Sequence, residues 1–204
     1  LLLQIQEPQK EKSLSTTITK YGAIEDSVSV KVKDQYEENP YPRWRYNSYS
    51  KENKLNFLSA INSEIYPNNI EPEEKEIKDS KTNILIAGCG TGIQIIEATR
   101  YENCDITAID LSNSSISYAK RKVEEYELEN INFLEMDILE VKHLKKEFDL
   151  IECSGVLHHM KNPSFGLSNL LGVLKPNGYM KLGLYSKFAR EMVIEIREFI
   201  RRIN

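Results

Sequence analysis

From residue 83 onward, short β-rich runs alternate regularly with longer helical stretches. The runs that predict strands lie at residues 83–87, 105–109, 132–135, 148–153 and 179–184. Helices are expected at about residues 92–100, 113–126, 164–174 and 187–202. Such alternation is typical of a parallel sheet with helices on both faces. The sequence therefore predicts an α/β fold, a Rossmann-like doubly wound sheet with five visible strands.

The residues before 82 follow a less regular pattern. The segment D-S-V-S-V-K-V-K at 26–33 alternates in a way that fits either a short strand or the start of a helix. Residues 54–65 place apolar side chains at helical spacing, which predicts a helix there. We expect an N-terminal extension over 1–66, a charged linker over 67–81 and the α/β domain over 82–204.

The extension contains an aromatic segment, Y-E-E-N-P-Y-P-R-W-R-Y-N-S-Y, at residues 36–49. Its two prolines disfavour both a regular helix and a central strand. One interpretation is a lid, in which Tyr36 and Tyr41 cover a binding pocket and exclude water. The alternative is that Trp44 and its neighbours pack onto the outer surface of the domain.

The composition disfavours several classes of function. The formal net charge is only −4, so no strongly basic field attracts nucleic acid in general. No run approaches the roughly 18 apolar residues of a transmembrane helix, and we expect a cytoplasmic protein that does not bind membranes. The cysteines Cys89, Cys104 and Cys153 lie in or beside apolar runs, which favours reduced core residues over a metal or redox site.

The run I-L-I-A-G-C-G-T-G, from Ile84 to Gly92, is the most informative motif. A buried strand leads into a turn with glycine at every second position, and a helix follows. Glycine lets the backbone turn sharply and approach a ligand, and the first amides of the helix can bind polar groups. Glycine-spaced turns also occur as structural turns, so a ligand role depends on what else converges there.

Asp110 places a carboxylate at the end of the second predicted strand, 18 residues after Gly92. In doubly wound sheets, an acidic residue at this position accepts hydrogen bonds from the ribose hydroxyls of a bound nucleoside. The alternative is that Asp110 caps the following helix, a role that Ser112 or Asn113 could fill equally well.

Two more predicted strands end in polar residues. After the third strand, Asp137 could accept a hydrogen bond from an adenine amino group while Ile138 covers the ring face. After the fourth, Cys153 and Ser154 lead into G-V-L-H-H at residues 155–159. Four loops therefore leave the same edge of the sheet, where ligands of such sheets bind.

These motifs, together with L-K-P-N-G at residues 174–178, resemble the consecutive motifs of class I S-adenosylmethionine-dependent methyltransferases over residues 83–184. The resemblance implies S-adenosylmethionine as the cofactor. The glycine turn would face its methionine part, Asp110 its ribose, and Asp137 with Ile138 its adenine. The cofactor-binding residues implied in this way are Gly88, Cys89, Gly90, Gly92, Asp110, Leu111, Asp137, Ile138, Cys153 and Ser154.

Two details refine the resemblance. Residues 36–44 are similar to a segment found before methyltransferase domains in bacterial proteins that also carry tetratricopeptide repeats, which implies such a region upstream. The family usually has an acidic residue where this chain has Ile86, so an interaction near the methionine amino group is lost or supplied elsewhere.

The adjacent His158 and His159 are candidates for catalysis. Neighbouring side chains on a helix point about 100° apart and no acidic or cysteine cluster lies nearby, so we expect no metal site. An imidazole could serve as a base for an acceptor that must lose a proton, or the pair could simply line the pocket or begin a helix.

The sequence thus predicts methyl transfer to an unidentified acceptor, expected to be a small molecule. A nicotinamide dehydrogenase is a rival, but its usual spacing needs glycine at the position of Ile93. A second rival is a non-catalytic nucleotide-binding or assembly module with the same fold. Because the family it resembles has seven strands, five visible strands predict a C-terminally incomplete domain with the edge of strand 179–184 exposed.

Overall fold

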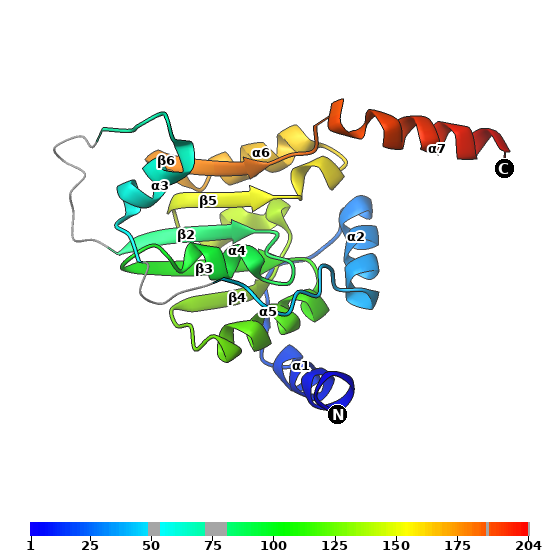
Figure 1. The fold of residues 1–204 in the computed structure, drawn as a ribbon, viewed down its shortest axis with the longest axis horizontal. Coiled ribbons are helices and arrows are strands. Elements are labelled where there is room, and N and C mark those ends of the chain that lie inside the picture. The colour runs from blue at the N-terminus through cyan, green and yellow to red at the C-terminus, as the bar shows by residue number, and fades with distance from the viewer. Residues whose placement is uncertain (49–53, 72–80, 187, 204) are drawn as a thin grey trace.

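The computed structural model describes residues 1–48, 54–71, 81–186 and 188–203. Within them, one six-stranded sheet has the order β1-β4-β3-β2-β5-β6, and every neighbouring pair is parallel (Figure 1). The strands are β1 (Thr19–Lys20), β2 (Thr82–Ala87), β3 (Cys104–Asp110), β4 (Ile131–Glu135), β5 (Phe148–Ser154) and β6 (Leu174–Gly183). The prediction of a Rossmann-like α/β fold is confirmed.

Helices cover both faces of this sheet. The α-helices of the described residues are α1 (Glu7–Ser15), α2 (Ser27–Glu38), α3 (Phe57–Ile65), α4 (Ile93–Ala98), α5 (Asn113–Glu125), α6 (Pro163–Leu171) and α7 (Glu191–Ile203), of which α2 and α7 do not lie on a face of the sheet. Alternate residues of β2 enter two different cores, Ile84 and Ile86 with α3, α4 and α5, and Leu85 and Ala87 with α6. The doubly wound layering follows from this alternation, because successive strand side chains point to opposite faces.

The predicted count of five strands is wrong. The sixth strand, β1, comes from the N-terminal segment, where Thr19 pairs with Leu134 and Lys20 with Glu135. A two-residue strand has no alternation that a sequence could reveal. The expectation of a C-terminally incomplete domain rested on the count of five, and that count was one strand too low. In addition, β6 begins at Leu174, five residues earlier than predicted, and β6 forms one edge of the sheet.

The ambiguous segment at 26–33 begins helix α2. Asp26 caps it, because its carboxylate accepts from the backbone N–H groups of Val28 at 2.9 Å and Ser29 at 3.0 Å. The helix stands beyond the carboxyl ends of the strands (Figure 1). This position brings residues of the N-terminal extension to the edge of the sheet where ligands bind.

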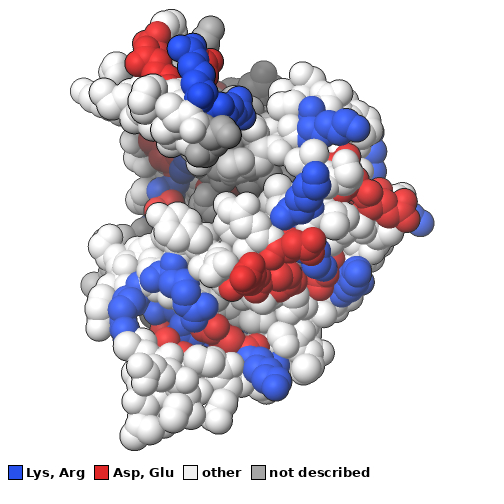
Figure 2. Space-filling view, turned by 90° about the vertical axis from the view of Figure 1, so that its right-hand side faces the viewer, with Lys and Arg blue, Asp and Glu red and all other residues white. Residues whose placement is uncertain are grey.

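Some predicted elements fall partly outside the described residues. These are positions 72–80 of the charged linker, Tyr49 of the aromatic segment and the first residue, Lys187, of the last predicted helix. The helix itself is present as α7, which extends away from the sheet (Figure 1). Among the described residues, no helix combines the length and apolar character that a bilayer span requires. On the face shown in Figure 2, acidic and basic side chains are interspersed.

Candidate functional site

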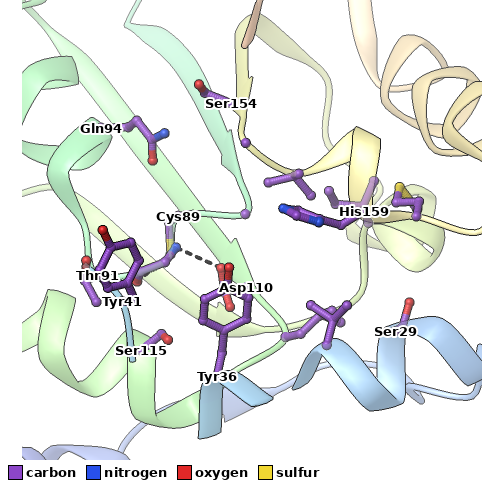
Figure 3. A pocket seen from close by; sticks show the side chains of 18 of the residues that line it. Ser29, Tyr36, Tyr41, Cys89, Thr91, Gln94, Asp110, Ser115, Ser154 and His159 are labelled. Atoms are coloured by element: carbon purple, nitrogen blue, oxygen red, sulfur yellow. Dashed lines mark hydrogen bonds between the residues drawn. The ribbon is translucent and has the colours of Figure 1, made fainter. Parts of the chain in front are cut away.

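A cavity of about 370 Å³ opens at the carboxyl ends of β2, β3, β4 and β5 (Figure 3). It brings together twelve of the predicted site residues: Tyr36, Tyr41, Gly88, Cys89, Gly90, Gly92, Asp110, Leu111, Asp137, Ile138, Ser154 and His159. Cys153 and His158 do not line it. These twelve residues span more than a hundred positions of the chain. The parallel sheet places ten of them around one opening, and the N-terminal extension contributes Tyr36 and Tyr41.

The turn after β2 requires glycine both for conformation and for space. Gly88 has φ +79° and Gly92 has φ +92°, values that other residues rarely adopt. A Cβ atom on Gly88 would lie 2.2 Å from Cγ2 of Val156, and one on Gly92 would lie 2.8 Å from Cβ of Ala119. The turn therefore packs closely against its neighbours, and its backbone forms one wall of the cavity.

Asp110 ends β3 beside this turn. One carboxylate oxygen accepts from the N–H of Gly90 at 2.8 Å (Figure 3). The other accepts from the N–H of Ser112 at 2.9 Å. Burial raises the pKa of Asp110, and these two hydrogen bonds oppose that rise. The cap of α5 is Ser112, whose hydroxyl accepts from the N–H of Ser115, so Asp110 is not the capping residue.

Asp137 and Ile138 follow β4 on the cavity wall. Asp137 is 3% exposed, and its carboxylate accepts from the N–H of Leu139 at 2.9 Å, which caps the short helix Ile138–Leu144. Ile138 is largely buried and presents an apolar surface beside this carboxylate.

Two histidines follow β5, and they have different surroundings. His159 lines the cavity, whereas the ring of His158 stacks on Tyr185 with 3.6 Å between centroids. Burial lowers the pKa of His158, and the nearby His159 and Arg190 lower it further. Burial also lowers the pKa of His159, and Arg190 adds to this shift. Both shifts favour the neutral form of the imidazole. Among the described residues, no group of three or more His, Cys, Asp or Glu side chains is arranged to hold a metal ion.

Cys153 belongs to the core on the α6 side and not to the cavity. It is 1% exposed, and burial raises the pKa of its thiol to about 12. Ser154, the next residue, lines the cavity. Consecutive strand residues point to opposite faces, so the two could not both present their side chains to the same ligand.

The residues of the aromatic segment lie in two different places. Tyr36 and Tyr41 line the cavity, as the lid hypothesis requires. The ring of Trp44 packs instead on α5, with centroids 6.3 Å from Tyr118 and 6.1 Å from Tyr126.

Several lining residues escaped the sequence analysis. Val28, Ser29 and Val32 reach the cavity from α2, and Tyr185 reaches it from just beyond β6. Val28, Val32 and Tyr36 recur every four residues, and this helical spacing after the cap at Asp26 could have revealed the lining face. Tyr185 had no such signal, because it lies one residue beyond the last predicted strand.

Comparison with known proteins adds three findings. A family model described as a methyltransferase domain matches residues 78–197. An uncharacterized protein of Synechococcus sp. is 33% identical over 122 residues, which are 59% of this chain and 29% of that protein. The ubiquinone biosynthesis O-methyltransferase of Coxiella burnetii is 32% identical over 125 residues, 61% of this chain and 51% of the enzyme. The chain thus spans about half or less of the length of these relatives.

Among solved structures, the N-methyltransferase NodS from Bradyrhizobium japonicum, in complex with S-adenosyl-L-homocysteine, is 24% identical with a TM-score of 0.44. The match covers 50% of this chain and 51% of that one.

Proposed function

The chain belongs to the methyltransferase-domain family, a family of S-adenosylmethionine-dependent enzymes, and on this premise we propose that it transfers a methyl group to a small-molecule acceptor. The observation that carries the proposal is the convergence of the glycine turn, Asp110 and Asp137 on one cavity. The tetratricopeptide-repeat region upstream stays a prediction.

The residues at the cavity fit this cofactor. The close packing of Gly88 and Gly92 leaves backbone rather than side chains at the turn, so a ligand can approach it. The carboxylate of Asp110 is held in place by two amides and can accept from ribose hydroxyls. Asp137 and Ile138 offer a hydrogen-bond acceptor and an apolar surface to the adenine. Gly90, Cys89, Leu111 and Ser154 complete the proposed contacts.

The acceptor would bind between the residues that hold the cofactor and helix α2, beside Tyr36, Tyr41 and His159. The cofactor supplies an activated methyl group, so the chain has to orient the acceptor and exclude water. Where the acceptor carries a proton, His159 is the proposed base, because its neutral imidazole can accept that proton. His158 is proposed to act on the site through its contact with Tyr185 rather than by direct contact with the acceptor.

Calorimetric titration with S-adenosylhomocysteine and labelling of a metabolite extract with a radioactive methyl donor test this function together. We expect micromolar binding and a labelled product, with no binding of NAD⁺. Absence of any cofactor binding by the folded chain would overturn the proposal. Binding without a labelled product across a broad acceptor panel would favour the non-catalytic module instead.

A further inference from the structure

The residues from 41 to 47, here called the strap, run along one face of α5 (Figure 1). Three of its backbone groups bond to side chains of this helix and of Tyr126, its C-terminal cap residue. Tyr118 donates to the carbonyl of Trp44, Lys122 donates to that of Arg45 at 2.8 Å, and the N–H of Asn47 donates to the hydroxyl of Tyr126 at 2.8 Å. The three side chains recur every four positions, so they form one stripe along the helix face. The strap is therefore held in a defined register on α5.

At its other side, the strap bonds to the glycine turn. The indole Nε1 of Trp44 donates to the backbone carbonyl of Thr91 at 3.0 Å. The hydroxyl of Thr91 donates in return to the carbonyl of Pro42 at 2.6 Å. Thr91 is only 2% exposed, so both hydrogen bonds are shielded from water. The two segments thus hold each other at Thr91, the residue between two glycines of positive φ.

Helix α5 supports both the strap and the glycine turn. The Trp44 ring packs on Tyr118 and Tyr126, and the ammonium of Lys122 lies 4.8 Å from the centre of its ring. Gly92 packs against Ala119, which lies between these residues along α5. The turn, the strap and α5 therefore form one interlocked unit.

We propose that Trp44 is a positioning residue for the cofactor, acting through Thr91. The carbonyl direction of Thr91 fixes the plane of the peptide between Thr91 and Gly92, and hence the shape of the turn. A turn with glycines on both sides of Thr91 has wide conformational freedom, and ordering it on binding would cost affinity. The hydrogen bond from Trp44 removes that freedom before the cofactor arrives. This inference rests on the proposed cofactor site.

A purely structural role makes a different prediction. If Trp44 only adds packing on α5, its loss lowers the melting temperature but leaves the affinity of the folded protein unchanged. Trp44→Phe separates the two roles, since it keeps an aromatic ring and removes the N–H donor. Thr91→Val removes the return hydrogen bond, Thr91→Ser keeps it, and Tyr46→Phe is the matched control because Tyr46 lies in the strap and is 87% exposed.

The experiment measures S-adenosylhomocysteine affinity by calorimetry and, without ligand, amide hydrogen exchange at residues 90–93 of the full chain. We expect Trp44→Phe and Thr91→Val to bind about five- to tenfold more weakly and to exchange faster, which matches the loss of one shielded hydrogen bond. Thr91→Ser should restore most of the affinity, and Tyr46→Phe should stay within twofold of the wild type.

Affinities within twofold for both Trp44→Phe and Thr91→Val, in folded proteins, would overturn the proposal whatever their exchange rates. If the wild type itself binds no S-adenosylhomocysteine, the proposed function is wrong. In that case hydrogen exchange still tests the role of Trp44, because an unchanged exchange rate at residues 90–93 in Trp44→Phe would show that the indole does not order the turn.

Discussion

At the residue scale, Asp110 shows how a site residue can be set in place before any ligand binds. Each of its carboxylate oxygens already accepts from one backbone amide, of Gly90 and of Ser112. A carboxylate has about four acceptor positions, so others remain for ribose hydroxyls. An asparagine has the same shape, but one end of its amide donates, and that end would face an N–H group.

We therefore expect Asp110→Asn to weaken S-adenosylhomocysteine binding by about one to two orders of magnitude, because hydrogen bonds to charged acceptors contribute roughly 1.5–3 kcal/mol. Calorimetric titration measures the change. Asp105→Asn is the control, since Asp105 lies near the start of β3, at the opposite end from Asp110, and its side chain is 40% exposed. Unchanged affinity in a folded Asp110→Asn variant would remove Asp110 from the cofactor site.

His159 leads to a prediction about pH. A base is active when deprotonated, and burial together with Arg190 lowers the pKa of His159 below its ordinary 6.5. The rate with a proton-bearing acceptor should therefore stay level as the pH falls to about 6.5 and decline only in more acidic solution. A pH profile of initial rates with the acceptor found by labelling measures this.

His159→Gln should lower that rate by about two to four orders of magnitude and abolish the acidic limb. His143→Gln serves as the control, because His143 lies outside the cavity and its side chain is 66% exposed. A wild-type acidic limb centred above pH 6.5, or one that persists in His159→Gln, would contradict the assignment of the base.

At the element scale, polar contacts dock α2 over the cavity. Lys33 pairs with the buried carboxylate of Glu135 at the end of β4. Glu37 accepts from the N–H groups of Asn113 at 2.8 Å and Ser114 at 2.9 Å, the first residues of α5. A carboxylate at a helix N-terminus is favoured by the helix dipole. These contacts fix which face of α2 meets the cavity.

Glu37→Gln should lower the free energy of unfolding by about 1 kcal/mol, because two charge-assisted hydrogen bonds to α5 are weakened. Urea unfolding measures the difference. Glu38→Gln is the matched control, since Glu38 is the exposed neighbour on the same helix. Equal losses in the two variants would mean that the contact with α5 contributes nothing specific to the docking of α2.

The lid hypothesis concerns the segment that follows α2. Tyr41 lines the cavity although it is 73% exposed, so its ring can cover a bound acceptor from the solvent side. Tyr41→Ala should lower turnover several-fold and leave S-adenosylhomocysteine affinity within about threefold. Tyr46→Ala, a change in the same segment away from the cavity, should alter neither. Steady-state rates and calorimetry test both, and turnover of Tyr41→Ala equal to wild type would rule the lid out.

At the scale of the whole molecule, a strand edge and an apolar helix surface lie open among the described residues. The outer edge of β6 has no strand partner among the described residues, and α7 buries none of its side chains. On α7, Phe199 is 63% exposed and Ile203 is 65% exposed. Exposed apolar surface and free strand edges both favour association.

We expect the 204-residue chain to associate with increasing concentration, and Phe199→Glu to reduce that association. Light scattering after size-exclusion chromatography measures the mass. Arg201→Glu changes a charge on the same helix without removing apolar surface, and should associate more than Phe199→Glu. A monodisperse monomer at all concentrations would show that these surfaces do not drive assembly.

The sequence by itself determined the sheet and the residues at its strand ends. Strand alternation, glycine spacing and the position of Asp110 are local properties, and parallel strands bring their carboxyl ends to one edge whatever the details of packing. For this reason the α/β fold and most of the cavity lining could be predicted. The number of strands could not, because β1 has only two residues and pairs with β4 across more than a hundred positions.

Only the tertiary structure decided how the N-terminal extension meets the site. The bond from Trp44 to Thr91 joins residues 47 positions apart, and Glu37 meets α5 across 76 positions. No local period encodes such pairs, since they depend on how whole elements pack. The same holds for Tyr185, which meets the cavity and the ring of His158 from beyond the last predicted strand. Chain-local patterns specify elements, whereas contacts between distant segments are selected by packing of the complete fold.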